Sequence, residues 1–378
     1  MIYFIAPYTS DFLGASTKIE GILKILTQID EVILINTYDA KSSSIYISKK
    51  LGIRVYNLPI YIKDRAVNTA INYLFNNKVV KQLKNNYNPP TTIWLYNSYF
   101  FESYLAKTLI ATYNSFFIFE IEDSVFSRFR GLHLKPFFDK LAWNNNIKKF
   151  DLAFVVNNNI SKELAYLKKN IVLLPGLISD DLIKYASKRN PFTDERKITI
   201  GYFGGLYLEK GAAFLMELFK NLPVNFHCIV TGTGELDNQF IEFANEYSDR
   251  VKFHGRIESQ QIYKLMSYCD IILNPHKPIS EMNNGVFPFK VFEAIASRRL
   301  VFSTQLPTDK MEELLHGVHF LDLNIQKWVN ALINSKNIYL ANKININNAA
   351  NKVCENFSEL FLKKLIAKYL KADKVMKI

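Results

Sequence analysis

The feature that most constrains the fold of this chain is a repeated alternation of short apolar runs with longer segments of helical periodicity. The run Ile2 to Ala6 is followed by a polar loop, Pro7 to Gly14, and then by a helical segment from about Ser16 to Leu26. A strand that is apolar on both faces and leads through a glycine-bearing loop into a helix is typical of a doubly wound parallel sheet. This opening unit predicts an α/β fold.

The alternation continues through the first half of the chain. Predicted strands cover residues 31–36, 53–58, 92–96, 116–121, 151–156 and 171–174. Between them we predict a short helix from Ser43 to Leu51, a longer helix over residues 67–87, and a third helix near Glu102 to Tyr113.

A polar segment with a proline, residues 190–197, separates this half from a second set of strands. We predict these at residues 198–203, 226–231, 251–254, 271–274, 300–303 and 318–321. The pattern therefore predicts one domain over residues 1–192, a second over residues 193–355 and a last helix over residues 356–378. A length of 378 residues is enough for two full cores, and ligands of such folds bind in the cleft at the carboxyl ends of the strands.

Composition and charge exclude several classes of protein. The three cysteines are widely spaced and form no C-x-x-C, which favours buried thiols over a disulfide or a zinc site. No apolar run approaches the roughly 18 residues of a spanning helix, and the first residues lack the basic segment of a signal peptide, so we expect a cytoplasmic chain. The formal net charge of +12 indicates a polyanionic partner: nucleic acid, an anionic membrane or a phosphorylated substrate.

The segment from Gly201 to Gly211 follows a predicted strand and opens a helix. It reads Gly-Tyr-Phe-Gly-Gly-Leu-Tyr-Leu-Glu-Lys-Gly. Gly204 and Gly205 would let the backbone approach a ligand, while Lys210 and the helix N-terminus offer positive charge to a phosphate. An ordinary turn with a solvent-exposed lysine explains the pattern about equally well.

A second glycine turn contains Gly232 and Gly234. It begins like the G-x-G-x-x-G motif, but Asp237 stands where the third glycine belongs. The difference argues against a dinucleotide pyrophosphate site, and so against a nicotinamide oxidoreductase. It leaves Gly234 as a candidate turn at the edge of a ligand.

A third segment, residues 284–294, leads into a predicted helix whose first turn carries Lys290. Glu293 lies three residues later on the same helical face. Either the two side chains form a helical ion pair, or Lys290 and the first amides of the helix hold a diphosphate while Glu293 binds a ribose diol. The residues that lead into the helix are candidate ligand contacts as well: Phe287, Pro288 and Phe289.

In their order and spacing, these segments resemble the retaining glycosyltransferases of family 4, which have the two-domain GT-B fold. The resemblance rests on G-x-L-x-x-E-K-G at 204–211, the strand with G-T-G-E-L at 230–236, V-K-F-H-G-R-I at 251–257, the run 263–275 and P-F-K-V-F-E-A at 288–294. It implies a nucleotide-sugar donor, with Lys210 at the diphosphate, Glu293 at the ribose, and the backbone of Arg256 and Ile257 at the base.

The sequence departs from the family at three positions. Gly205 stands where the family has an arginine that partners the lysine, Gly285 stands where the first of two paired glutamates belongs, and Pro288 replaces a glycine. Lys290 can restore the lost positive charge. The alternative is a GT-B protein that has lost catalysis and serves as a binding or assembly subunit.

In the first half, Glu122 and Asp123 come directly after the predicted strand 116–121. At the carboxyl end of a parallel strand, either carboxylate could orient a hydroxyl of the acceptor or the donor, or Asp123 could cap the next segment. Gly14 resembles the family's glycine beside the donor phosphate, and it is equally the tight turn that such a loop needs.

The resemblance also implies a chemistry and its partners. The chain has no Asp-x-Asp motif, so we expect fixed cations and helix amides, instead of a metal or another cofactor, to stabilise the leaving diphosphate. We expect transfer of a hexosyl unit from a UDP- or GDP-linked sugar, with retention of anomeric configuration. The expected acceptor is a saccharide or a lipid-linked molecule in cell-surface polysaccharide synthesis.

Basic residues gather in the first half, near three aromatic residues. They are Lys78, Lys81, Lys84, Arg128, Arg130, Lys135, Lys140, Lys148 and Lys149, with Phe137, Phe138 and Trp143 among them. This pattern favours the anionic inner face of a membrane over nucleic acid, for which no binding motif occurs. A solvated lysine face is the alternative. The last helix either returns to the first domain, as the resemblance implies, or stays free.

Overall fold

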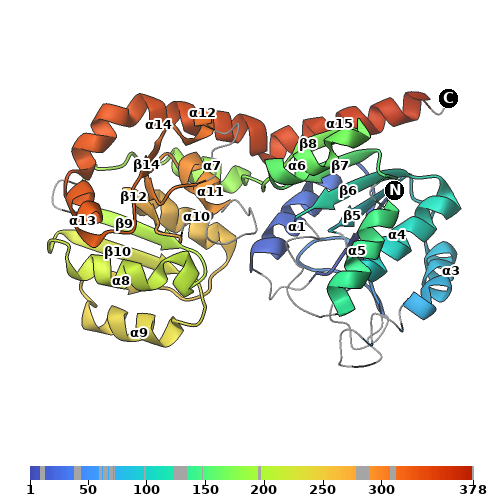
Figure 1. The fold of residues 1–378 in the computed structure, drawn as a ribbon, viewed down its shortest axis with the longest axis horizontal. Helices are drawn as coiled ribbons and strands as arrows, with labels where there is room; N and C mark the ends of the chain where they lie inside the picture. Colours follow the sequence, from blue (N-terminus) through green and yellow to red (C-terminus); the bar gives the residue numbers. More distant parts are fainter. Residues whose placement is uncertain are drawn as a thin grey trace. The chain divides into compact units, whose positions relative to one another are not determined.

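The chain forms two compact α/β units in a computed structural model (Figure 1). One unit comprises Met1–Leu177 with Glu359–Ile378, and the other comprises Ile178–Ser358. The structure describes all residues except 9–12, 38–43, 59–61, 63–66, 68–70, 72, 98, 123–133, 147, 195–196, 278–288, 307–311 and 377–378. At 13–16, 44, 134–137, 145–146 and 371–376 it describes the backbone.

The first unit is built on an eight-stranded sheet in the order β3-β4-β2-β1-β5-β6-β7-β8. Its strands are β1 (Ile2–Ala6), β2 (Val32–Asn36), β3 (Ser44–Ile47), β4 (Arg54–Asn57), β5 (Thr92–Tyr96), β6 (Phe116–Ile121), β7 (Leu152–Val155) and β8 (Asn170–Leu173). Its longer helices are α1 (Leu13–Leu26), α3 (Asn76–Asn86), α4 (Phe100–Tyr113), α5 (Leu134–Asn146) and α15 (Glu359–Met376). All described pairs are parallel except β3 with β4.

The second unit is built on a six-stranded parallel sheet in the order β11-β10-β9-β12-β13-β14. Its strands are β9 (Ile198–Phe203), β10 (Phe226–Thr231), β11 (Val251–Phe253), β12 (Ile271–Asn274), β13 (Leu300–Ser303) and β14 (Val318–Phe320). The helices that bear on the site are α7 (Asp180–Ala186), α8 (Ala212–Lys220), α9 (Asp237–Glu246), α10 (Ser259–Tyr268), α11 (Lys290–Ala296) and α14 (Ser335–Phe357). The predicted strands of this half match to within one residue.

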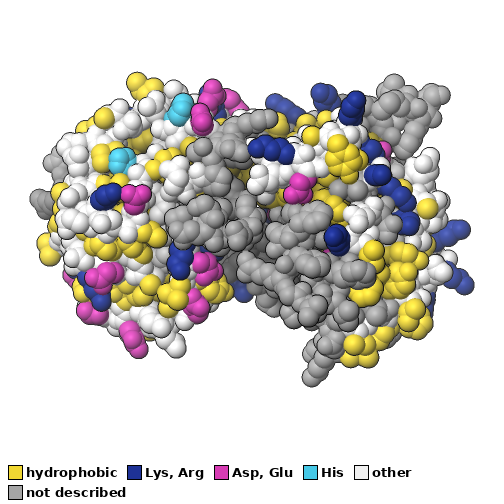
Figure 2. All heavy atoms as spheres, in the orientation of Figure 1, with side chains coloured by type: hydrophobic (Ala, Val, Ile, Leu, Met, Phe, Trp, Pro, Cys, Tyr) yellow, Lys and Arg dark blue, Asp and Glu magenta, His cyan; other side chains and the backbone are white. Residues whose placement is uncertain are grey.

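Charge differs between the two units on the face shown in Figure 2. There, Lys and Arg side chains outnumber Asp and Glu on the first unit, whereas both signs occur on the second. The difference agrees with the predicted gathering of basic residues in the first half of the chain. The described helices do not include one that is long and apolar enough to cross a bilayer.

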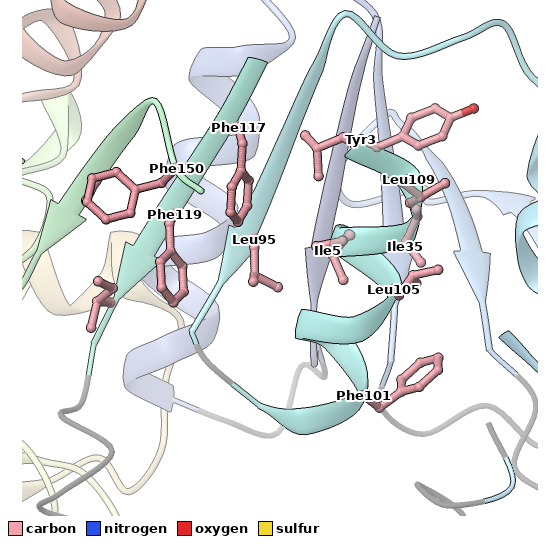
Figure 3. Packing of buried hydrophobic residues seen from close by; sticks show 14 of the residues in the cluster. Tyr3, Ile5, Ile35, Leu95, Phe101, Leu105, Leu109, Phe117, Phe119 and Phe150 are labelled. Carbon is pink, nitrogen blue, oxygen red and sulfur yellow. The ribbon is translucent and has the colours of Figure 1, made fainter. Parts of the chain in front are cut away.

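The core of the first unit shows why its strands are apolar on both faces. All five residues of β1 are buried, and so are all six of β6. Side chains from β1, β5 and β6 lie beside Leu105 and Leu109 of α4 on one face of the sheet (Figure 3). The other face packs against α1 and α15.

The units do not divide at the predicted boundary between residues 192 and 193. Fully buried Asp270 accepts hydrogen bonds from the Arg189 guanidinium at 3.1 Å and from the Phe192 amide at 2.7 Å. Arg299, also buried, donates to the carbonyl of Arg189 at 2.8 Å. Because these buried polar groups need their partners, residues 178–192 belong to the second unit.

The last helix, α15, packs on the first unit. Leu362 and Ile366 are fully buried in the same cluster as the apolar side chains of α1. Lys24 of α1 forms an ion pair with Glu359 at 2.8 Å. The described part of this helix is therefore not a free tail.

Two predicted details of the first half are wrong. The segment predicted as a helix from Ser43 to Leu51 contains strand β3, whose Ile45 and Ile47 pair with Tyr56 and Arg54 of β4. Its β-branched and aromatic residues favour a strand once a neighbouring edge is available. Gly14 was predicted in the first loop, but α1 begins at Leu13, so Gly14 lies in the first turn of the helix.

Candidate active site

The second sheet reverses its strand order between β9 and β12, so the loops that follow these two strands meet at one edge. β9 is followed by residues 204–211 and β12 by residues 275–277, after which the described chain resumes just before α11. Ligands of doubly wound sheets bind at such a switch point, outside the carboxyl ends of the strands. This edge carries the residues that the sequence singles out as Lys210, Lys290 and Glu293.

Gly211 brings the two loops into backbone contact. It has a φ of +78°, and a Cβ added there would lie 1.7 Å from the carbonyl oxygen of Pro275. Beside it, the amide of Lys277 donates to the carbonyl of Glu209 at 2.9 Å. A side chain at position 211 would separate the loops, so this glycine is required for the site to close.

The contact places Lys210 next to His276, a residue that the sequence reasoning missed. The Nζ atom of Lys210 lies 3.2 Å from Nε2 of His276, which is 3% exposed. The Nδ1 atom lies 2.6 Å from the carbonyl oxygen of Lys277, and since a carbonyl only accepts, Nδ1 carries the proton. Nε2 is thus left to accept from the lysine. Burial and the nearby lysines lower the pKa of His276 to about 4, so the ring is neutral.

Lys290, the first residue of α11, extends its side chain toward Tyr202 and Gly204. Its Nζ lies 5.0 Å from the ring centroid of Tyr202, and a Cβ added at Gly204 would lie 3.3 Å from it. The hydroxyl of Tyr202 lies 2.9 Å from the carbonyl oxygen of Gly205 and 3.1 Å from that of Lys210, and it shares its one proton between them. Buried Tyr202 therefore joins the Gly204 loop to both lysines.

The two lysines leave this edge of the sheet with uncompensated positive charge. Among the described residues, neither lies within ion-pair distance of a carboxylate. Burial, and after it the charge of Lys210, lowers the pKa of Lys290 to about 7. Burial also lowers the pKa of Lys210, and Glu209 offsets a part of that effect. An anion bound between these groups would remove the repulsion that the free site bears.

Glu293 lies one helical turn after Lys290 and forms no ion pair with it, so the predicted alternative of a helical ion pair is wrong. Its Oε1 accepts a long hydrogen bond from the hydroxyl of Tyr263 at 3.5 Å. Burial raises the pKa of the carboxyl to about 7. A half-buried carboxyl with one weak partner retains acceptor capacity for a ligand hydroxyl.

The remaining glycines of this edge have packing roles. A Cβ at Gly205 would lie 2.8 Å from the Tyr207 ring, and one at Gly234 would lie 2.5 Å from the carbonyl oxygen of Leu206. Asp237 accepts from the amide of Gly234 at 2.7 Å and from the hydroxyl of Thr233 at 2.5 Å. Its own carboxylate thus occupies the start of α9, where a dinucleotide would place its pyrophosphate.

The other predicted ligand contacts are spread over the turn after β11 and the start of α11. Arg256 is exposed and Ile257 is half-buried. Phe289 is half-buried before α11, with its ring 5.9 Å from that of Phe292. Phe287 and Pro288 lie outside the described residues, as do Gly285 and Asp123.

In the first unit, Glu122 belongs to a buried ionic cluster that the sequence reasoning also missed. Lys18 of α1 is 8% exposed, and its Nζ pairs with Glu122 and, at 2.9 Å, with Glu120. It also donates to the carbonyl of Leu174 at 3.0 Å, and Trp94 Nε1 donates to Glu120 at 2.8 Å. Glu122 is therefore not a free carboxylate. The sequence contained one sign of this cluster: Lys18 stands directly before Ile19, on the face of α1 that is otherwise apolar.

The balance of charge in this cluster is negative, because one lysine faces two carboxylates. Burial raises the pKa of Glu122 to about 7; Lys18 opposes this shift and Glu120 adds to it. The side chain of Glu122 is 19% exposed, so it can still reach a ligand, whereas Glu120 at 1% cannot. Gly14 lies in the first turn of α1, where amides lack helical acceptors.

Comparisons with known proteins bear on the fold and on the family of the second unit. Residues 197–335 match the family described as Glycosyl transferases group 1. No curated protein matches the chain. A sucrose-phosphate synthase from Thermosynechococcus elongatus aligns with a TM-score of 0.67 at 15% identity, over 98% of this chain and 99% of that one. HepE of Anabaena, in complex with UDP and glucose, aligns with a TM-score of 0.65 at 15% identity and the same coverage.

A third solved structure, the lipopolysaccharide outer core galactosyltransferase WaaB, aligns with a TM-score of 0.59 at 15% identity, over 98% of this chain and 99% of that one. At such identities the likeness shows the fold, and the predicted GT-B class of two Rossmann-like units is confirmed. The matched domain contains every described residue of the lysine site and supports a glycosyltransferase.

Proposed function

We propose that this chain transfers a hexosyl unit from a UDP- or GDP-linked sugar to a saccharide or lipid-linked acceptor in cell-surface polysaccharide synthesis. The observation that carries the proposal is the pair Lys210 and Lys290, which converge at a sheet switch point without a described carboxylate partner. Two structural neighbours support the proposed donor and acceptor classes: HepE is complexed with UDP and glucose, and WaaB is a lipopolysaccharide galactosyltransferase.

The donor diphosphate lies between the two lysines in this proposal. A Cβ at position 205 would lie 2.8 Å from the ring of exposed Tyr207, so an arginine there would require that ring to move. Lys290, at the start of α11, supplies the second cation instead. The neutral Nε2 of His276 accepts from Lys210 and so orients its ammonium group. Glu293, one turn from Lys290, binds the ribose hydroxyls, and the turn of Arg256 and Ile257 meets the base.

The reaction proceeds with retention and without a metal in this proposal. The bond from the anomeric carbon to the phosphate oxygen breaks, and both lysines stabilise the charge that develops on the diphosphate. The acceptor oxygen forms the new bond on the same face and passes its proton to the leaving phosphate oxygen. In the first unit, Glu122, held by Lys18, orients a hydroxyl of the acceptor. The basic first unit favours a place at the cytoplasmic face of the membrane.

The first prediction concerns the reaction itself. In a screen of UDP- and GDP-sugars, we expect one donor to be hydrolysed or transferred, with EDTA leaving the rate unchanged. NMR of the product should show the donor's anomeric configuration. An inverted product, or activity lost in EDTA, would contradict the retaining, metal-free reaction. Nucleotide binding without any turnover would favour a binding subunit that has lost catalysis.

The affinity of the protein for UDP should depend on pH. The pKa of Lys290 is about 7 in the free protein, and a bound diphosphate raises it, so binding of UDP takes up a proton above pH 7. UDP affinity should therefore fall as the pH rises from 7 to 9, by up to about tenfold per unit, in titration calorimetry. The terminal phosphate of UDP, with a pKa of about 6, is already ionised in this range.

The matched control for this titration is Lys290→Arg. Arginine keeps its charge over the whole range, so the affinity of this variant should be nearly flat from pH 7 to 9. Glu293, whose pKa is also about 7, is removed as a source of the slope by Glu293→Gln. A slope that persists in Lys290→Arg and vanishes in Glu293→Gln would assign the proton to the carboxyl instead.

A further inference from the structure

The first unit exposes large apolar side chains beside α3 and on α5. Leu74 is 76% exposed, Phe75 is 47% exposed, and Phe138 and Leu141 are each 40% exposed. In Figure 2, hydrophobic side chains gather over the part of the first unit where Figure 1 draws α3 and α4, with Lys and Arg beside them. Adjacent exposed apolar residues of this size are uncommon on a surface that meets water alone.

A chain of packed aromatic rings links the segment before α3 with α5. Tyr73 lies 4.4 Å from Tyr104 and 5.2 Å from Phe100, measured between ring centroids, and Phe100 lies 5.1 Å from Phe138. The rings thus run from the segment before α3, across α4, to α5. We call the surface formed by Leu74, Phe75, Phe138 and Leu141 over this ring chain the aromatic face.

The aromatic face is bordered by lysines. Helix α3 has an exposed lysine at every third position: Lys78, Lys81 and Lys84. Val79 and Leu83 of the same helix are buried. On α5, exposed Lys140 lies between Phe138 and Leu141 in the sequence. Long lysine side chains beside exposed apolar residues suit a boundary between water and an apolar phase.

The acidic side chains of the same helices point away from this surface. α3 contains no Asp or Glu. Glu102 of α4 is 7% exposed and accepts from the Thr37 hydroxyl at 2.6 Å, and Asp139 of α5 is 1% exposed and accepts from the Phe100 amide at 2.9 Å. The described surface of the three helices therefore carries one sign of charge, which complements an anionic surface.

We propose that the aromatic face and its lysines dock the first unit on an anionic lipid bilayer. Leu74, Phe75, Phe138 and Leu141 enter the boundary between head groups and acyl chains, and the lysines of α3 contact the anionic head groups. This inference depends on the surface alone and stands whether or not the proposed reaction is correct.

The structure also revises which aromatic residues can take part. Trp143, predicted among the surface aromatics, is 3% exposed and packs 6.0 Å from the Phe119 ring, so it belongs to the core. Lys148 and Lys149 are exposed. The side chains of Lys135 and Phe137, and residues Arg128 and Arg130, lie outside the described set.

The test is co-sedimentation of the full chain with vesicles of phosphatidylcholine alone or mixed with phosphatidylglycerol. The wild type should bind the mixed vesicles at low salt and bind phosphatidylcholine far more weakly. The variant Lys78→Gln/Lys81→Gln/Lys84→Gln should bind mixed vesicles about a hundredfold more weakly. The variant Leu74→Ser/Phe75→Ser should lose the binding that remains at high salt. All substituted side chains are exposed, and circular dichroism checks that the variants fold.

The matched control lies in the second unit. Leu340 and Ile344 of α14 are 60% and 76% exposed next to exposed Lys343. The variant Leu340→Ser/Ile344→Ser should bind vesicles as the wild type does. Equal binding to both vesicle types, no binding to mixed vesicles at low salt, or loss in the α14 variant with retention in the α3 variants would each overturn the proposal.

Discussion

Replacing Lys290 with alanine is expected to raise the dissociation constant of UDP by roughly 10- to 100-fold, since a hydrogen bond to a charged group contributes about 1.5–3 kcal/mol. The loss in kcat/KM should be larger, about 100- to 1000-fold, because the diphosphate gains negative charge as the sugar leaves. Titration calorimetry with UDP and initial rates with the accepted donor measure the two effects.

The same variant should unfold at a temperature no lower than the wild type. Lys290 is half-buried near a second lysine, and desolvation together with the charge of Lys210 lowers its pKa, so the folded protein disfavours its charge. Its removal relieves that repulsion. Loss of Lys290 should therefore weaken UDP binding without lowering stability. Loss of a structural residue would weaken both.

Two further variants make this prediction sharper. Lys210→Ala should weaken UDP binding to a similar degree, and the double variant should weaken it beyond either. Lys252→Ala removes an exposed lysine of β11 and should leave the affinity unchanged. If Lys290→Ala bound UDP as the wild type does, the lysine pair would not be the diphosphate site.

Replacing Lys18 with methionine should have the largest effect on stability. It leaves Glu120, which is 1% exposed, and Glu122 without their cation. Removing one partner of a buried ion pair costs about 3–5 kcal/mol, which for a unit of this size lowers the unfolding midpoint by roughly 6–20 °C. Chemical and thermal unfolding followed by circular dichroism measure this loss.

The control is Lys50→Met. Lys50 pairs with Glu20 at 2.7 Å, but the two side chains are 50% and 22% exposed, so water screens the pair. The loss of stability there should be about 0–1 kcal/mol. An equal loss in both variants would show that the Lys18 cluster is no more important than a surface pair.

The stability loss of the Lys18 variant should also depend on pH. The pKa of Glu122 is raised from 4.5 to about 7, so the folded protein binds more protons than the unfolded chain in this window, and stability decreases as the pH rises through it. Without Lys18, protonation is the remaining way to neutralise the cluster. The difference between variant and wild type should therefore be smaller at pH 5 than at pH 8. A difference independent of pH would point to lost packing instead.

The sequence alone determined the α/β class and most strands, and it singled out Lys210, Lys290 and Glu293 as candidate ligand contacts. These follow from local patterns: apolar runs of strand length, glycine turns, and the three-residue spacing of Lys290 and Glu293. Such patterns depend on the backbone's short-range geometry, so they can be read without knowing which segments meet. The resemblance to family 4 added roles to these residues but could not decide between an ion pair and two separate ligand contacts.

The tertiary structure decided what depends on contact between distant segments. His276 meets Lys210 because Gly211 packs on Pro275, and Lys18 meets Glu120 and Glu122 because α1 covers β6. The boundary between the units follows from the hydrogen bonds of buried Asp270. Residues 44–47 form strand β3 because they pair with β4. In all of these cases except β3, which pairs with the next strand, a buried polar or backbone group found its partner far away in the chain. The free energy of that pairing is absent from any local sequence pattern.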